Sequence, residues 1–148
     1  MREILFRGAQ KVDGAKTLIW YEGSLIIETD SYTGEKEYYI QNENGSFLVI
    51  SESVGQYTGE QIANEKLFID DIVEWYEDYD DSWGYPSTAY GRSVVIWDEK
   101  NYCLAFYSGK DKSGEDIIQP FNDWTWDNTE IIGNIHDNPE LLKEADNE

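Results

Sequence analysis

The sequence predicts a mainly β fold (β-rich α+β) of bent sheets, with a small SH3-like barrel portion and one short C-terminal helix. Three observations support this fold class. Apolar runs have the length of strands and are rich in β-branched and aromatic residues. Asp13-Gly14 and Asn44-Gly45 lie between such runs, and pairs of this kind favour the type I′ turns of β-hairpins. Only the end of the chain carries the residue pattern of a helix start.

The first third of the chain is expected to form hairpins. A strand before Asp13-Gly14 is predicted by alternating apolar and polar residues, and a return strand follows the turn. The return strand is expected to bulge or bend at Gly23, because glycine inside a strand marks such a site. A second hairpin is expected around Asn44-Gly45. The strands expected here are residues 2–7, 18–21, 24–28, 38–40 and 47–50.

The stretch from Val54 to Tyr76 is the one around which the other strands are expected to pack. Gly55 and Gly59 bracket a short aromatic strand. Residues 60–66 are polar and weakly helical, which predicts a loop or one short turn. Residues 67–76 form an apolar run of strand length, which predicts a single continuous strand.

The second half predicts further strands and then the helix. A strand carrying Asp71, a long loop and a strand after Gly91 have the spacing seen in small SH3-like barrels, which is an analogy of fold alone. The helix is expected to begin with Asn138 as N-cap and Pro139 as its first residue. The strands expected in this half are residues 92–97, 102–107 and 130–135.

Composition limits the classes of protein to consider. At 148 residues the chain is expected to be one domain, in which residues 1–52 and 53–148 are candidate lobes. The net charge of −20 argues against direct binding to nucleic acid or to an anionic membrane surface. No apolar run approaches the ~20 residues of a membrane helix, and no signal-peptide core is seen. A soluble cytoplasmic protein is therefore expected.

The sequence offers no convincing catalytic or metal-binding motif. Asp78-x-Asp80-x-Ser82 imitates the start of a calcium loop, but Trp83 stands where that loop needs glycine. Cys103 lies in an apolar strand and is expected to be a buried small hydrophobe. His136 precedes the helix, and a polar or capping role is expected for it. We therefore expect no enzyme activity, no metal, no cofactor and no small-molecule substrate.

An acidic and aromatic segment, expected to be the loop 77–86, is the one candidate interaction site. From Leu67 to Gly91 there are seven acidic residues and no basic one. Aromatic side chains supply contact energy at interfaces, and charge of one sign accelerates association with an oppositely charged partner. The alternative reading is a solvated acidic loop without a partner. The candidate residues are Tyr76, Glu77, Asp78, Tyr79, Asp80, Asp81, Trp83 and Tyr85.

Three blocks of sequence resemble the YopX proteins of phages and prophages of Gram-positive bacteria. They are residues 1–8, residues 54–59 with 68–73, and residues 131–142. This chain departs from the family pattern at Asp70, where the family usually has glycine, and in the segment 61–65, where it usually has an Asp-Lys-Asn-Gly type of turn. The resemblance implies a mostly β, intracellular, phage-derived protein, and it supplies no catalytic residues.

Two hypotheses for function remain open. The first is a non-enzymatic phage accessory protein that acts by protein–protein contact or by self-assembly into a homo-oligomer. The second is an acidic inhibitor that mimics nucleic acid and blocks a host nucleic-acid-binding or defence enzyme. In an extended segment the acidic residues would lie ~6 Å apart, which is sparser than the ~1.7 Å of duplex DNA.

Overall fold

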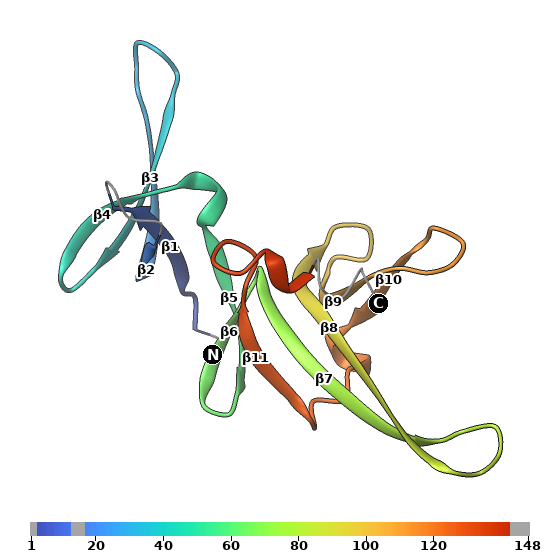
Figure 1. Ribbon diagram of the computed structural model, residues 1–148. Coiled ribbons are helices and arrows are strands. Elements are labelled where there is room, and N and C mark those ends of the chain that lie inside the picture. The colour runs from blue at the N-terminus through green and yellow to red at the C-terminus, as the bar shows by residue number, and fades with distance from the viewer. Residues whose placement is uncertain (1–2, 13–16, 143–148) are drawn as a thin grey trace. The chain divides into compact units, whose positions relative to one another are not determined.

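The computed structural model describes residues 3–12 and 17–142 and is mostly β, which confirms the predicted class (Figure 1). The chain divides into two compact units, residues 1–60 and 61–148. The first sheet has the strand order β4-β3-β2-β1-β5-β6, and the second has the order β10-β9-β8-β7-β11. Both sheets are open in the described residues, so the predicted barrel portion is not closed into a full barrel.

The described residues contain short 3₁₀ turns as well as strands. The strands are β1 (Phe6–Lys11), β2 (Leu18–Thr29), β3 (Lys36–Asn42), β4 (Gly45–Val49), β5 (Gly55–Ile62), β6 (Glu65–Phe68), β7 (Asp71–Asp80), β8 (Pro86–Asp98), β9 (Cys103–Lys110), β10 (Asp116–Pro120) and β11 (Thr129–Asn134). The 3₁₀ turns are η1 (Ser51–Ser53) and η2 (Phe121–Asp123).

Unit 1 is built around β1. Ala9 in this strand is fully buried, and its backbone N–H donates to the Ser53 hydroxyl at 2.9 Å. Gly8 lies so close to Val49 and Ile40 that a side chain there would collide with both. The small residues of β1 therefore let the strands of this unit pack closely.

Several expectations for unit 1 need adjustment. The first strand begins at Phe6 rather than Arg2, while the Asp13-Gly14 turn lies outside the described residues. The second hairpin is present, but its loop is Glu43-Asn44 and Gly45 already belongs to β4. Gly23 marks the point at which β2 changes partner, from β1 to β3.

Two expectations at the start of unit 2 need correction. The segment 60–66, expected to be a loop or one short turn, is mostly strand, because β5 and β6 form a hairpin in which only Ala63 and Asn64, with φ of 51° and 67°, make the turn. The run at residues 67–76 is not one strand, because Asp70 at φ 79° turns the chain between β6 and β7. Left-handed φ is unusual for alanine, so Asn64 alone was too weak a turn signal to predict the hairpin.

The second sheet carries the core of unit 2. β7 pairs with β8 along nearly its whole length, and β11 and β9 flank this central pair. Aromatic side chains from the segment after β10 pack on Phe106, with ring centroids at 4.0 Å from Trp124 and 4.8 Å from Phe121. The buried cluster consists of Ile62, Leu67, Val73, Val95 and Phe106.

The C-terminal helix is present and begins at Glu140, one residue after the predicted first residue Pro139. Residues 140–142 are helical, and the backbone N–H of Leu141 donates to the carbonyl of Asn138 at 3.1 Å. The Asn138 side chain accepts a hydrogen bond from the backbone N–H of Asn134 at 3.3 Å. It therefore ties the helix start back to the end of β11.

Candidate functional site

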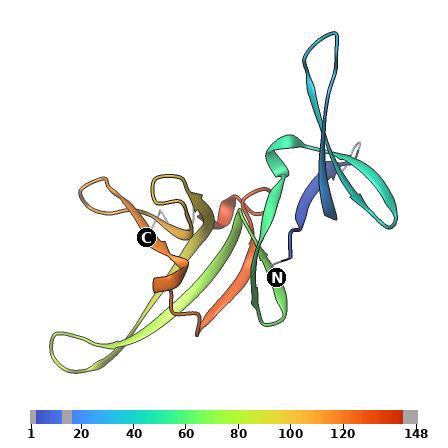
Figure 2. The ribbon, with the colours of Figure 1, turned by 180° about the vertical axis from the view of Figure 1, so that it is seen from behind.

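The outer part of the β7–β8 hairpin is the first component of the candidate site. β11 pairs with β7 only as far as Trp75, and β9 pairs with β8 only from Val94 onward. Beyond these points β7 and β8 pair with each other, so a two-stranded ribbon extends past the rest of the sheet (Figures 1 and 2). We call residues 76–90 the β7–β8 arm.

The expected loop at residues 77–86 is therefore mostly strand, which corrects the prediction. β7 continues to Asp80, and only residues 81–85 form the turn. The Asp81 carboxylate accepts hydrogen bonds from the backbone N–H groups of Trp83 and Tyr85, both at 2.9 Å. Gly84 supplies the left-handed φ of 82° that closes the turn. An aspartate side chain thus organises the tip of the arm.

The arm exposes aromatic rings among carboxylates. Its five aromatic side chains are between 42% and 84% exposed. Glu77, Asp78, Asp80 and Asp81 supply four negative charges, and residues 76–90 include no basic residue. The exposed aromatic residues are Tyr76, Tyr79, Trp83, Tyr85 and Tyr90. Exposed aromatic side chains in such number are typical of an interaction surface.

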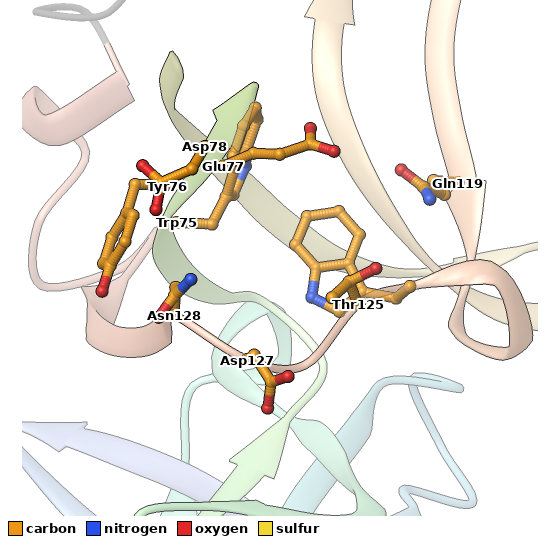
Figure 3. Close-up of a pocket in the computed structure, with 9 residues that line it drawn as sticks. Trp75, Tyr76, Glu77, Asp78, Gln119, Thr125, Asp127 and Asn128 are labelled. Carbon is orange, nitrogen blue, oxygen red and sulfur yellow. The ribbon is translucent and has the colours of Figure 1, made fainter. Parts of the chain in front are cut away.

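A pocket of about 340 Å³ lies at the base of the arm, and its lining residues come from unit 2 alone (Figure 3). The segment between η2 and β11 forms one side, and β7 forms the other. The lining residues are Trp75, Tyr76, Glu77, Asp78, Gln119, Trp124, Thr125, Asp127 and Asn128. The volume is at the lower end of the range for ligand sites.

Trp75 forms a rigid wall of the pocket. Its indole Nε1–H donates to the buried Ser93 hydroxyl at 3.0 Å. Its six-membered ring lies directly over Gly91, where an added Cβ would be 2.2 Å from a ring carbon. Glycine at position 91 therefore lets the indole lie flat across β8.

Trp124 is held in a similar way. Its indole Nε1–H donates to the Thr129 hydroxyl at 3.3 Å, and its ring packs on Phe106. The rings of Trp75 and Trp124 meet edge to face, with centroids 6.1 Å apart and an interplanar angle of 86°. Both indole N–H groups are satisfied within the protein, so the walls present ring carbon rather than a donor.

Carboxylates supply the charged part of the lining, beside the polar side chains of Gln119, Thr125 and Asn128. Glu77 and Asp78 come from β7, and Asp127 comes from the opposite segment. Figure 3 shows Glu77 leaving β7 on the side of Gln119 and Thr125, whereas Asp78 leaves it on the other side. The Asp78 carboxylate accepts a hydrogen bond from the Thr88 hydroxyl at 2.8 Å. The pocket combines aromatic walls with acceptors of negative charge, which is chemistry suited to an organic cation.

The structure brings only part of the predicted site together. Tyr76, Glu77 and Asp78 line the pocket, while Tyr79 and Asp80 lie farther along the arm. The remaining predicted residues, Asp81, Trp83 and Tyr85, belong to the turn at the tip of the arm. The sequence prediction missed Trp75, Trp124, Asp127 and Tyr90. A wider reading of the aromatic and acidic pattern would have included Tyr90, but no local signal joins Trp75 to Trp124.

The two residues considered for nucleophilic chemistry lie outside the pocket lining. Cys103 is half-buried at the start of β9, where it pairs with Asp98 of β8. The His136 Nε2 atom lies 3.0 Å from the Asp70 carboxylate. Among residues 3–12 and 17–142, no group of three or more histidine, cysteine, aspartate or glutamate side chains is arranged to hold a metal ion.

A family model described as "YopX protein" matches residues 8–143 of the chain. The chain belongs to the YopX family. This confirms the resemblance seen in the sequence, and the match includes the β7–β8 arm and the pocket of this YopX protein. No curated protein and no solved structure matches the chain. Within the described residues, no helix has the length and apolar character needed to cross a membrane.

Proposed function

We propose that this YopX protein acts by protein–protein contact, with the β7–β8 arm as the contact surface and a protein of basic surface as the partner. The observation that carries the proposal is the arm itself, where five exposed aromatic rings stand among four carboxylates without a basic residue. Aromatic side chains dominate the binding energy of interfaces. Unneutralised carboxylates raise the association rate with a basic partner.

The arm is also shaped for contact. Beyond Trp75 and Val94 both of its strands lack a second neighbour among the described strands, so past the contact of Tyr76 with Asn128 its outer edges are open to a partner. The turn at its tip is fixed by the Asp81 side chain. A surface that is ordered before binding loses less conformational entropy when the partner docks.

A basic partner is better supported than self-assembly through this surface. Two arms that meet face to face would place the carboxylates of one copy against those of the other. Like charges in contact cost several kcal/mol at an interface. Self-assembly through another part of the chain is compatible with the proposal, and the oligomeric state is measured in the same experiment.

Mimicry of nucleic acid is the second candidate. The charge density of the arm would approach that of DNA only if both strands carried carboxylates. All four lie on β7 or in the turn, and residues 86–90 of β8 have none. The arm therefore supports contact with a basic protein surface more strongly than it supports imitation of a phosphate backbone.

The proposed setting is the cytoplasm of a Gram-positive bacterial host, in which the protein serves a phage or prophage as an accessory protein. The resemblance to YopX proteins of phages supports this setting. It also defines the cell extract from which a partner should be sought.

The experiment compares the host proteins captured by the wild-type chain, by an arm variant and by a control variant. Each capture is done at low and at physiological salt. The arm variant is D78N/D80N/D81N, and the control variant is E28Q/E35Q/E43Q, which removes the same charge from exposed positions of unit 1. A captured protein is identified, purified and measured again in isolation. We expect binding about tenfold or more weaker for the arm variant and nearly unchanged for the control.

Three results would contradict the proposal. One is equal binding by the arm and control variants, which would mean that net charge alone attracts the partner. Another is light scattering that shows a discrete oligomer of the chain and no bound host protein. The third is a nucleic-acid-binding enzyme whose capture is abolished by duplex DNA as competitor, which would favour mimicry.

A further inference from the structure

We infer that the pocket at the base of the arm takes the guanidinium group of an arginine side chain of the partner. The inference rests on the proposed function, because it names the partner's side chain that the site would hold. Its basis is the pocket's own chemistry, in which aromatic rings and carboxylates together line a cavity of about 340 Å³.

The aromatic walls are fixed before any ligand arrives. Trp75 is held by its hydrogen bond to Ser93 and by its contact with Gly91. Trp124 is held by Thr129 and by the ring of Phe106. Since neither indole has a free N–H to offer, the walls attract a cation through their π-electrons and do not attract an anion. Trp gives the strongest cation–π contacts of the aromatic side chains.

The polar lining includes three carboxylates, which are acceptors of the kind that a guanidinium needs, beside the side chains of Gln119, Thr125 and Asn128. Glu77 lines the cavity from β7 and Asp127 lines it from the segment between η2 and β11, and the lining includes no lysine or arginine that would neutralise them. Asp78 already accepts a hydrogen bond from Thr88, so Glu77 and Asp127 are the main anionic partners. A guanidinium presents five N–H donors in one plane and pairs with carboxylates in a fork geometry.

Arginine fits this lining better than the other cations do. A lysine ammonium is a compact, strongly hydrated point charge, whereas a guanidinium is weakly hydrated and stacks on aromatic rings. A divalent metal ion would need several oxygen ligands at short range, and the described residues contain no such group. A planar guanidinium can stack on a tryptophan ring and at the same time donate hydrogen bonds to a carboxylate, so it would use both the aromatic and the acidic part of the lining.

The test is titration of the purified chain with N-acetyl-arginine amide, followed by calorimetry and by NMR of the tryptophan indole protons. N-acetyl-citrulline amide is the uncharged control of the same shape, and N-acetyl-lysine amide tests the choice of cation. The pocket variants are Asp127→Asn and Glu77→Gln. The matched control is Asp80→Asn, which removes one carboxylate from the arm outside the pocket lining.

We expect the arginine derivative to bind the wild-type chain, to shift the Trp75 and Trp124 indole signals, and to bind the two pocket variants about tenfold more weakly. Binding to Asp80→Asn should be unchanged, and the citrulline derivative should not bind. Equal binding of the citrulline and arginine derivatives would overturn the inference. So would an equal loss in Asp80→Asn, or the absence of any binding.

This inference and the proposed function fail in different ways. If partner binding depends on the arm while the arginine derivative does not bind, the arm is supported as the contact surface and the pocket is not an arginine site. If the arginine derivative binds while the arm variant keeps its partner, the pocket is a site for a free guanidinium compound and the contact proposal falls. The Asp127→Asn variant links the two, because it alters the pocket and leaves residues 76–90 intact.

Discussion

Single residues decide whether the pocket exists, and Gly91 is the clearest case. The indole of Trp75 occupies the space that any larger residue at position 91 would need. The strand pairing places Gly91 opposite Trp75 in β7 and β8. Gly91 therefore matters through Trp75, because the absence of a side chain at position 91 leaves room for the indole.

We expect Gly91→Ala to lower the free energy of unfolding by about 1–3 kcal/mol, because the new methyl group displaces the indole from a packed surface. Urea denaturation of the variant measures the change. The same substitution in a Trp75→Leu background is the control, since the smaller side chain leaves room for a methyl group. An equal loss in both backgrounds would show that the collision with Trp75 is not the cause.

Asp70 holds an unusual backbone conformation at the turn between β6 and β7. Its φ is 79°, its backbone N–H donates to the Val95 carbonyl at 2.9 Å, and its carbonyl accepts from Ile135 at 3.0 Å. The resemblance to YopX proteins implies glycine at this position, which is the residue that adopts such a φ without strain. Here the contact of the Asp70 carboxylate with His136 offsets the strain.

We expect Asp70→Gly to be nearly neutral in the wild-type chain, because relief of strain and loss of the His136 contact oppose each other. In a His136→Ala background the contact is already absent, so the same change should stabilise the protein by about 1 kcal/mol. Thermal and urea unfolding of the wild type, the two single variants and the double variant give the coupling free energy between Asp70 and His136. A cycle in which Asp70→Gly has the same effect in both backgrounds would contradict the account.

At the scale of the element, the turn of the β2–β3 hairpin depends on Asp30. Its carboxylate accepts hydrogen bonds from the backbone N–H groups of Tyr32 at 2.7 Å and Thr33 at 3.1 Å. These backbone hydrogen bonds, Tyr32 first, hold the pKa of the Asp30 carboxyl below its ordinary value, because they favour the charged form. The stabilisation is thus complete at pH values above the pKa of the unfolded chain and is lost as the pH falls through the lower folded pKa.

We expect the wild-type chain to be more stable than Asp30→Asn near neutral pH, and the difference to shrink toward zero on acidification. Unfolding by urea at a series of pH values measures it. Asp111→Asn is not a suitable control, because Asp111 organises a turn of its own. Glu35→Gln, an exposed change in the same hairpin, is the better one. If the stability difference between the wild type and Asp30→Asn grew toward acidic pH, the predicted direction of the pH dependence would be wrong.

Elements with strong local sequence signals were predicted, and elements that depend on pairing with distant strands were missed. Asn44-Gly45 marked its hairpin because both residues have strong turn preferences. The β5–β6 hairpin was missed because Ala63 takes a left-handed φ, which pairing of the two strands imposes on a residue that does not favour it. The arm was read as a loop because aspartate is poor in strands, and only the partner strand β8 keeps it extended.

The arm also gives a test at the scale of the element. We expect that replacing residues 78–88 by Asn-Gly, which joins the opposed residues Glu77 and Ala89 in a two-residue hairpin, changes the free energy of unfolding by less than about 1 kcal/mol. The reason is that the outer arm pairs only with itself. Binding to the proposed partner should be lost in the same variant. A large loss of stability would show that the arm packs on other parts of the chain.

At the scale of the whole molecule, the candidate site was only partly accessible to sequence reasoning. The acidic and aromatic character of the arm is a local property of the chain, and the sequence analysis found it. The pocket is not local, because Trp75 and Trp124 meet only through the pairing of β7 with β11. Sequence patterns cannot supply that pairing, since many strand orders satisfy the same pattern of apolar residues.

The net charge of −20 is the property of the whole molecule with the most direct physical consequence. Repulsion among like charges destabilises the compact state of both units. Salt screens this repulsion, since the Debye length falls from about 30 Å at 0.01 M to about 8 Å at 0.15 M. Screening also weakens exposed ion pairs such as Lys110 with Asp116, but such pairs contribute little. The loss of repulsion should therefore outweigh the loss of attraction, so added salt should stabilise the protein.

We expect the melting temperature to rise as sodium chloride increases from low to physiological concentration, as measured by circular dichroism. The D78N/D80N/D81N variant should show a smaller rise, because three neighbouring carboxylates of the arm are gone. E28Q/E35Q/E43Q has the same net charge, so it separates the effect of clustering on the arm from that of total charge. A melting temperature that stays flat or falls with salt would show that attractive pairs outweigh repulsion.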